Sequence, residues 1–246
     1  MKIGMTSLTF GSRSIEEVIN IAQNAGIDGI EWGVRDNHAV NDENLYTIKE
    51  LSLQTGIEIF SLGSYCYMTD LEDCKKTVDM AAKLSAPVIR IWAGKKSPWD
   101  CDEKEFDSIV GNAKGMAEYA DQFGIALGFE YHNHSLTETS ESAVSLAKAI
   151  DCKNVGLYWQ NNENLSYEQN KNDLQQVTPY LAGIFHIQNH TVKEGKMLLE
   201  DIVDNIAGYL KPFGNTDYRA LIEFVKNGDE DYFYRDVKAL RMALER

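Results

Sequence analysis

Short apolar segments alternate along the chain with longer segments in which apolar residues recur every three to four positions. The short runs are typical of buried strands, and the longer period is typical of helices that pack on one face. The apolar runs predict eight strands, at residues 2–10, 27–32, 58–65, 88–94, 125–134, 155–160, 181–188 and 219–225. The periodic segments predict eight helices, at residues 14–26, 42–55, 71–84, 103–123, 140–150, 166–177, 199–210 and 231–246.

A regular alternation of strand and helix predicts a parallel sheet. Eight such units in 246 residues, about 31 residues each, predict a closed (β/α)8 TIM barrel that forms a single domain over residues 1–246. The competing architecture is an open doubly wound sheet, which a glycine-rich nucleotide-binding turn usually marks. The sequence contains neither a G-x-G-x-x-G nor a Walker A segment, which favours the barrel.

The segment 125–134, IALGFEYHNH, carries the first sign of chemistry. Strand side chains alternate between two faces, so Leu127, Phe129 and Tyr131 form one large apolar face. The opposite face begins with small residues and ends with Glu130 and His132. Because a TIM barrel places its active site at the carboxyl ends of the strands, these two side chains are expected there.

The ends of other predicted strands carry polar residues of the same kind. They are Glu31 on the second strand, Gln160 and the nearby Glu163 on the sixth, His186 and Gln188 on the seventh, and Glu223 on the eighth. Buried carboxylates are costly unless they are paired or bound to a cation. A divalent cation between Glu130, His186 and Glu223 would balance the two carboxylates. Oxygen ligands with one imidazole fit Mn²⁺ best, and Mg²⁺, Co²⁺ or Zn²⁺ also suit such a set.

Each candidate also has a purely structural interpretation. Glu130 could be ion-paired, and Arg90 on the fourth strand is expected to form an ion pair inside the barrel. Glu31 is more typical of a supporting carboxylate, His132 fits a hydrogen-bonded structural histidine equally well, and Gln188 could simply orient a neighbour. Tryptophans near the strand ends could wall a sugar pocket or only pack: Trp32, Trp92 and Trp99.

Composition limits the classes of partner and the cellular compartment that the sequence allows. The net charge of −14, from 24 basic and 38 acidic residues, argues against a nucleic-acid partner, whose binding depends on clustered basic residues. The four cysteines form no C-x-x-C pair and are interpreted as free thiols of a reducing compartment: Cys66, Cys74, Cys101 and Cys152. With no long apolar run or leader pattern, the expectation is a cytoplasmic protein without membrane contact.

With these features the chain resembles the xylose isomerase-like TIM-barrel superfamily over nearly its whole length. It is most similar to the sugar phosphate isomerase/epimerase group, which includes the ketose 3-epimerases and inosose dehydratase. The resemblance rests on the motifs GFEYH, IFHIQ and LIEFV. It implies that Glu130, His186 and Glu223 bind a divalent metal. It also implies a fourth ligand at Gln160, where the family usually has aspartate.

Two further positions depart from the epimerase pattern. Glu163 stands where the epimerases have histidine, and the position of an arginine after the seventh strand falls on Val192, with Lys193 and Lys196 nearby. These departures separate the chain from the epimerase subgroup more than from the superfamily.

The resemblance implies an isomerase or epimerase acting on a small sugar or polyol by proton abstraction next to a carbonyl, through an enediolate held at the metal. Glu130 and Glu223 would be the catalytic acid and base. The residues expected to contact substrate are His132, Gln188, Trp92 and Glu163. A homo-oligomer is compatible with the sequence.

Three other readings remain open from the sequence. The first is a metal-dependent dehydratase of an inosose-type substrate, and the second is a barrel that binds carbohydrate without turnover. The third, a phosphodiester-cleaving barrel of the AP endonuclease type, is disfavoured by the acidic charge and the five histidines.

Overall fold

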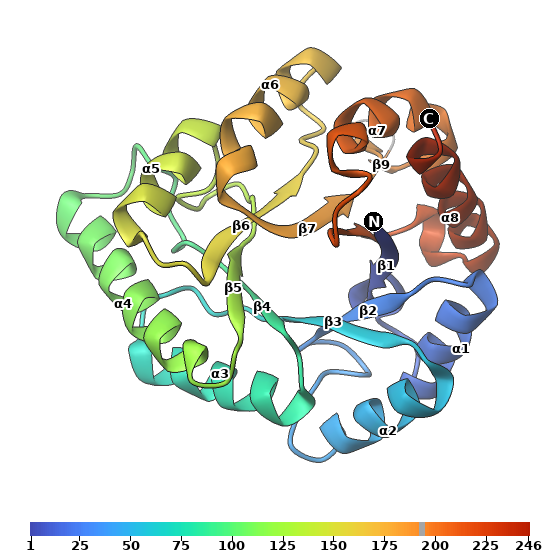
Figure 1. Cartoon of the computed structure of the whole chain (residues 1–246), viewed down its shortest axis with the longest axis horizontal. Helices are drawn as coiled ribbons and strands as arrows, with labels where there is room; N and C mark the ends of the chain where they lie inside the picture. The colour runs from blue at the N-terminus through green and yellow to red at the C-terminus, as the bar shows by residue number, and fades with distance from the viewer. Residues whose placement is uncertain (192–194) are drawn as a thin grey trace.

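The computed structural model describes residues 1–191 and 195–246. Within these residues eight parallel strands close into a barrel in the order β1-β10-β7-β6-β5-β4-β3-β2 (Figure 1). The barrel strands are β1 Lys2–Thr6, β2 Gly29–Gly33, β3 Glu58–Gly63, β4 Val88–Ile91, β5 Ala126–Phe129, β6 Val155–Gln160, β7 Leu181–Ile187 and β10 Arg219–Ile222. The predicted (β/α)8 barrel is therefore confirmed.

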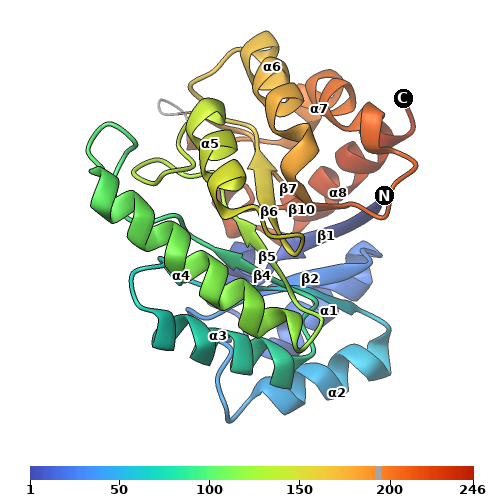
Figure 2. The same ribbon diagram turned by 60° about the vertical axis from the view of Figure 1, so that its left-hand side comes forward.

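Helices form an outer ring around the strands, and α3 and α4 lie side by side along it (Figures 1 and 2). The α-helices are α1 Ile15–Ala25, α2 Leu45–Thr55, α3 Leu71–Leu84, α4 Glu103–Asp121, α5 Ser140–Ile150, α6 Tyr167–Val177, α7 Val203–Leu210 and α8 Glu230–Leu244. Five short 3₁₀ turns join them within the described ranges: η1 Ser7–Phe10, η2 Thr178–Tyr180, η3 Leu199–Ile202, η4 Lys211–Phe213 and η5 Lys226–Gly228. Helix α1 starts at a reciprocal cap between Ser14 and Glu17, because each side chain bonds a backbone N–H that the helix leaves unpaired.

Several strands are shorter than predicted: the third ends at Gly63, the fourth at Ile91, the fifth at Phe129 and the eighth at Ile222. The first strand is also shorter. It ends at Thr6 and continues as η1, where Ser7 Oγ accepts a hydrogen bond from the Gly33 N–H (2.9 Å) that ties this turn to β2. The predicted helix 199–210 likewise begins as the 3₁₀ turn η3. A two-stranded antiparallel sheet that the periodicity did not predict, β8 His190–Thr191 with β9 Gly195–Lys196, follows β7. Val192 and Lys193 lie outside the described residues.

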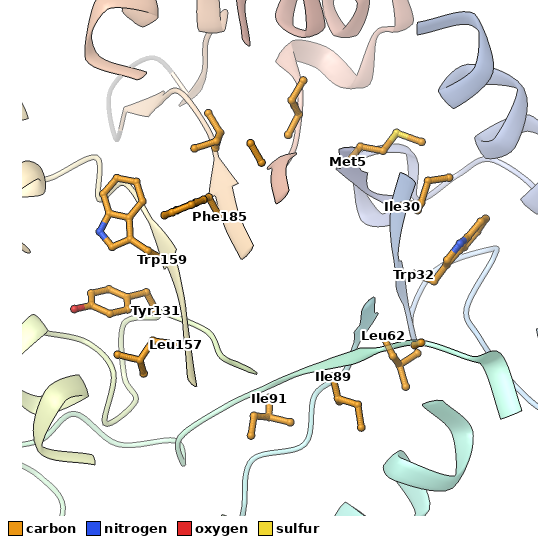
Figure 3. Close-up of a cluster of buried hydrophobic side chains, with 14 of the residues drawn as sticks. Met5, Ile30, Trp32, Leu62, Ile89, Ile91, Tyr131, Leu157, Trp159 and Phe185 are labelled. Atoms are coloured by element: carbon orange, nitrogen blue, oxygen red, sulfur yellow. The ribbon is translucent and has the colours of Figure 1, made fainter. Parts of the chain in front are cut away.

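Two apolar layers surround the strands. Between strands and helices lies the larger core, which includes Trp159, Phe185 and Ile30 (Figure 3). Leu127, Phe129 and Tyr131 belong to it, as the alternation in the fifth strand predicted.

Inside the barrel a second, smaller cluster fills the end away from the carboxyl tips. It consists of Phe60, Val88, Tyr158, Ile184 and Leu221. The Tyr158 ring lies so close to Gly128 that a Cβ there would come within 2.2 Å of it. Because β5 has a glycine at this position, the Tyr158 ring can pack against the strand. The five side chains of this cluster form an apolar plug, which is the floor under the polar strand tips.

Other sequence expectations concern thiols and membranes. The four cysteines are free, as predicted, and the sulfurs of Cys66 and Cys74 lie 2.9 Å apart. Across the described part of the chain, none of the helices combines the length and the apolar character that crossing a membrane requires.

Asp236 on α8 is 1% exposed, and its Oδ1 accepts a 2.7 Å hydrogen bond from the backbone N–H of Leu199, the first residue of η3. Burial raises the pKa of Asp236 to about 7, against an ordinary value of 3.8. In the unfolded chain the carboxyl ionises at the lower value, so the stability that it contributes is complete below that value and is lost as pH rises through about 7.

We expect Asp236→Asn to remove this loss, because asparagine keeps the acceptor oxygen and carries no charge. Its free energy of unfolding, measured by urea titration, should rise relative to the native chain as pH increases from about 4 to about 7. As a control, Asp236→Ala is also uncharged but lacks the acceptor, so it should be less stable than Asp236→Asn at every pH. A constant difference between Asp236→Asn and the native chain across this range would contradict the role given to Asp236.

Candidate functional site

A cavity of about 390 Å³ opens at the carboxyl ends of the barrel strands. Its wall includes residues that follow all eight barrel strands, among them Leu8, Arg35, Tyr65 and Gln188. Seven residues singled out from the sequence for catalysis, metal or substrate lie on it: Trp92, Glu130, His132, Gln160, Glu163, Gln188 and Glu223. The volume falls within the range of sites for small organic ligands.

Glu130, His186 and Glu223 converge here, with both glutamates on the cavity wall and His186 fully buried. One ligand atom from each lies within 4.8 Å of the others, and the three side chains are 3%, 0% and 6% exposed. Both glutamates follow directly after their strands. The Glu130 N–H donates to the Ile91 carbonyl (2.9 Å) and the Glu223 N–H to the Ile187 carbonyl (3.1 Å), so the neighbouring strands fix where each side chain enters.

The backbone around both glutamates is held further. The Thr137 hydroxyl donates to the Glu130 carbonyl at 2.5 Å. After Glu223 the chain turns sharply at Phe224, whose φ of 62° lies in the left-handed region that non-glycine residues rarely adopt. The Phe224 N–H donates to Thr9 Oγ1 at 3.0 Å, which anchors this turn to the segment after β1.

Arg90 is the positive centre of the site. Its Nη1 lies 2.8 Å from Glu130 Oε1 and 3.9 Å from Glu223 Oε1, and its Nε lies 3.4 Å from Glu31 Oε1. The predicted ion pair inside the barrel is thus confirmed, and Glu31 has the supporting place expected of it, with Ser61 donating a 2.7 Å hydrogen bond to Glu31.

Opposite charges control protonation here. Burial alone would raise the pKa of Glu31, but the nearby positive charges of Arg90 and His186 lower it to about 2. Burial likewise opposes ionisation of Glu130, yet Arg90 holds the pKa of this carboxyl below its ordinary value. For His186, burial disfavours the charged ring, but Glu223 and Glu31 outweigh it and hold the imidazole pKa well above its ordinary value.

Several buried polar atoms facing this region lack a hydrogen bond within the described residues: Glu130 Oε2, Gln160 Oε1 and both ring nitrogens of His186. Gln160 is the register partner of His186 across β6 and β7, and its Nε2 donates to the Tyr131 carbonyl at 2.5 Å. The side-chain oxygen of Gln160, Oε1, has no hydrogen-bond donor within the described residues. Two carboxylates, an imidazole and an amide oxygen are a donor set suited to a divalent cation.

Aromatic side chains form one wall of the cavity. The rings of Trp92 and His132 lie 3.9 Å apart between centroids, and Tyr65 and Tyr67 flank Trp92 at 5.9 and 5.3 Å. His132 Nδ1 is 2.6 Å from the Asn133 carbonyl, so Nδ1 carries the hydrogen in the neutral ring and Nε2 is the free acceptor.

The other tryptophans take no part in this wall. Trp32 is fully buried between strand and helices, where Figure 3 shows it beside β2, and Trp99 is 69% exposed and does not line the cavity.

Sequence reasoning missed several cavity residues. Arg35 comes three residues after the predicted second strand and Tyr65 is the last residue of the predicted third strand, so the position of both near strand ends was a signal for them. His190, whose Nδ1 lies 3.7 Å from Glu163 Oε1, belongs to the unpredicted β8. Nothing in its local pattern indicated that position.

The sequence of the chain matches a known protein family and a curated protein. A family model described as the xylose isomerase-like TIM barrel matches residues 19–234. A 3-dehydroshikimate dehydratase of Bacillus anthracis is 25% identical over 167 residues, or 63% of this chain and 60% of the relative. That match spans less than two thirds of the relative's own length.

Solved structures share the fold. A probable 3-DHS dehydratase from Bacillus anthracis superposes with a TM-score of 0.81 at 19% identity, covering 98% of this chain and 99% of that one. A D-tagatose 3-epimerase-like protein gives a TM-score of 0.78 at 19% identity, covering 100% and 97% of the two chains. Because the family model spans most of the sequence and the described strands close into the barrel it stands for, the chain belongs to the xylose isomerase-like TIM barrel family.

Proposed function

We propose that this chain is a divalent-metal-dependent sugar isomerase or epimerase that removes a proton from the carbon next to a carbonyl. The observation that carries the proposal is the convergence of Glu130, His186 and Glu223 at an open cavity. Membership of the xylose isomerase-like TIM barrel family, together with the likeness to an epimerase-like protein and to a dehydratase, supports an enzyme that acts on a small sugar or polyol.

Glu130, His186 and Glu223 would hold the metal, and Gln160 Oε1 would complete the set. The unsatisfied atoms of Glu130, Gln160 and His186 support this choice. When bound, a divalent cation supplies a Lewis acid that stabilises negative charge on substrate oxygen. Mn²⁺ suits the mixed oxygen and nitrogen donors, and Mg²⁺, Co²⁺ and Zn²⁺ are alternatives.

Glu130 and Glu223 enter the cavity from β5 and β10, which β6 and β7 separate in the barrel order. A substrate between them therefore meets carboxylates on two sides. One carboxylate takes the proton from carbon, and the other returns a proton from the opposite side, which inverts that carbon. Arg90 keeps Glu130 ionised, as the lowered pKa of Glu130 indicates, so this carboxylate is ready to act as the base.

The remaining cavity residues would position the substrate. Trp92 offers an apolar face, and His132 beside it presents its free Nε2. Glu163 and Gln188 stand elsewhere on the wall as hydrogen-bonding groups for hydroxyls.

A dehydratase is the second candidate, and His132 is the observation that favours it. A protonated imidazole on the wall could give its proton to a departing hydroxyl after Glu130 or Glu223 has taken the proton from carbon. The curated relative named a dehydratase supports this candidate. Mass spectrometry of the product separates the two, since dehydration loses one water and epimerisation loses nothing.

For the catalytic assignment, we expect Glu130→Gln and Glu223→Gln each to lower kcat by about 10²- to 10⁴-fold, the usual contribution of a positioned acid or base. Turnover of ketoses would be followed by NMR in D₂O, where exchange of the proton next to the carbonyl reports its abstraction directly. EDTA should abolish exchange, and added Mn²⁺ should restore it. Glu118→Gln, on the exposed face of α4, should behave like the native chain. Full activity in both site variants would exclude the mechanism.

For the fourth ligand, we expect Gln160→Leu to weaken Mn²⁺ binding by about tenfold and Gln160→Asp to strengthen it, because affinity in such sites follows the number and charge of oxygen ligands. Isothermal titration calorimetry of the metal alone measures both effects without reference to activity. Equal affinity of Gln160→Leu and the native chain would show that the amide oxygen does not bind metal.

A further inference from the structure

The charges on the cavity wall are unevenly matched. Glu138 accepts hydrogen bonds from Ser97 and from the His134 backbone, and Glu163 lies near His190. Among the basic residues, Arg90 is engaged by three glutamates below. Arg35 lines the same cavity, and within residues 1–191 and 195–246 no carboxylate is paired with it.

Arg35 is nevertheless held in place. Its guanidinium carbon lies 3.3 Å from the ring centroid of Tyr65, which stacks the planar group on the aromatic face. Stacking leaves the N–H groups at the edge of the guanidinium available for a fork of hydrogen bonds. The loop that carries it is anchored, because the Val34 N–H donates to the Gly63 carbonyl and the Asn37 N–H to the Gly11 carbonyl.

The neighbouring acid does not neutralise this arginine. The Asp36 carboxylate lies against Gly11, where a Cβ would come within 2.7 Å of its Oδ2. Another basic side chain near the site, Lys196, lies over the Phe224 ring at 3.8 Å and lines a small adjoining hollow beside Glu223. Arg35 therefore presents positive charge to the cavity without an acidic partner in the described chain.

The distance from Arg35 to the acidic cluster suits a small molecule. The Tyr65 centroid lies 3.3 Å from the Arg35 guanidinium and 5.7 Å from that of Arg90, which contacts Glu130. Both guanidinium groups therefore lie close to the same aromatic ring. A single sugar-sized molecule can place its carbonyl end at the glutamates and its far end at Arg35.

We propose that Arg35 binds an oxyanion at the far end of the substrate, so that the preferred substrate is an acidic keto-polyol that carries a carboxylate or a phosphate ester. This inference rests on the proposed function of the same cavity. It makes Arg35 a specificity-determining residue. Two oxygens of one carboxylate or phosphate accept two parallel hydrogen bonds from the guanidinium, which a neutral hydroxyl cannot do. It also explains why an acidic cavity in an acidic protein keeps an unneutralised arginine on its wall.

The test compares matched ligands on the Mn²⁺-loaded full chain. D-tagatose and D-tagatose 6-phosphate differ only in the phosphate, and 3-dehydroshikimate supplies a carboxylate. Calorimetry should show tighter binding of at least one anionic probe than of D-tagatose. Arg35→Gln should weaken binding of that probe by about 10- to 100-fold, the range of a charge-assisted hydrogen-bonded pair. Its affinity for D-tagatose should stay within about threefold. The probe that loses affinity distinguishes the phosphate from the carboxylate.

Lys95→Gln provides the matched control. Lys95 is exposed, stacks on Tyr67 at 4.2 Å and does not line the cavity. Its loss changes the net charge equally, so a similar weakening in both variants would indicate general attraction and overturn the contact. The assignment is equally overturned if Arg35→Gln keeps the anion preference, or if neither anionic probe binds more tightly than D-tagatose. In each of those cases, metal-dependent proton exchange that requires Glu130 and Glu223 would leave the proposed function standing.

Discussion

Five ionisable side chains share the closed interior of the barrel, and their mutual compensation is the constraint on which the site depends. Glu31, Arg90, Glu130, His186 and Glu223 are each at most 6% exposed. An ion in such a place costs several kcal/mol unless partners replace the water it has lost. Arg90 lies within 4 Å of all three carboxylates. Because the five residues come from β2, β4, β5, β7 and β10 or directly after them, the compensation exists only when the barrel is closed.

The apolar plug beneath this cluster makes the compensation stronger. Tyr158 stands edge-on to His186 at 5.4 Å between ring centroids and fills the space that Gly128 leaves. Within the described residues, apolar side chains thus cover the cluster from below, and Glu130 and Glu223 line the cavity above it. In such a low-dielectric setting each paired charge interacts more strongly, and each unpaired charge is more costly. The apolar floor of the barrel therefore strengthens the charge interactions on which the site above it depends.

The sequence predicted those parts of the site that follow from periodicity. Strand alternation and the strand-helix repeat together indicate that Glu130, His186 and Glu223 meet, because both patterns are local and the barrel closes in only one way. The loops are different. Arg35 owes its place to hydrogen bonds between segments distant in sequence, and the short sheet that carries His190 has no apolar period. The end of β1 at Thr6 was also out of reach, since the turn after it is tied to β2 by the hydrogen bond from the Gly33 N–H to Ser7 Oγ.

The amide at Gln160 also follows from the charge balance. With Glu31, Glu130 and Glu223 ionised and Arg90 protonated, the interior carries two uncompensated negative charges, which a divalent cation at the proposed site would cancel when His186 is neutral. An aspartate at the position of Gln160 would add a further negative charge, while Arg90, the basic residue of this cluster, already faces three carboxylates. An amide supplies the ligand oxygen without that charge, and its Nε2 finds a partner in the Tyr131 carbonyl. In this barrel the pairing of Glu31 with Arg90 leaves the ligand set balanced with a neutral side chain at the end of β6, so the departure from the usual aspartate is consistent with a working metal site.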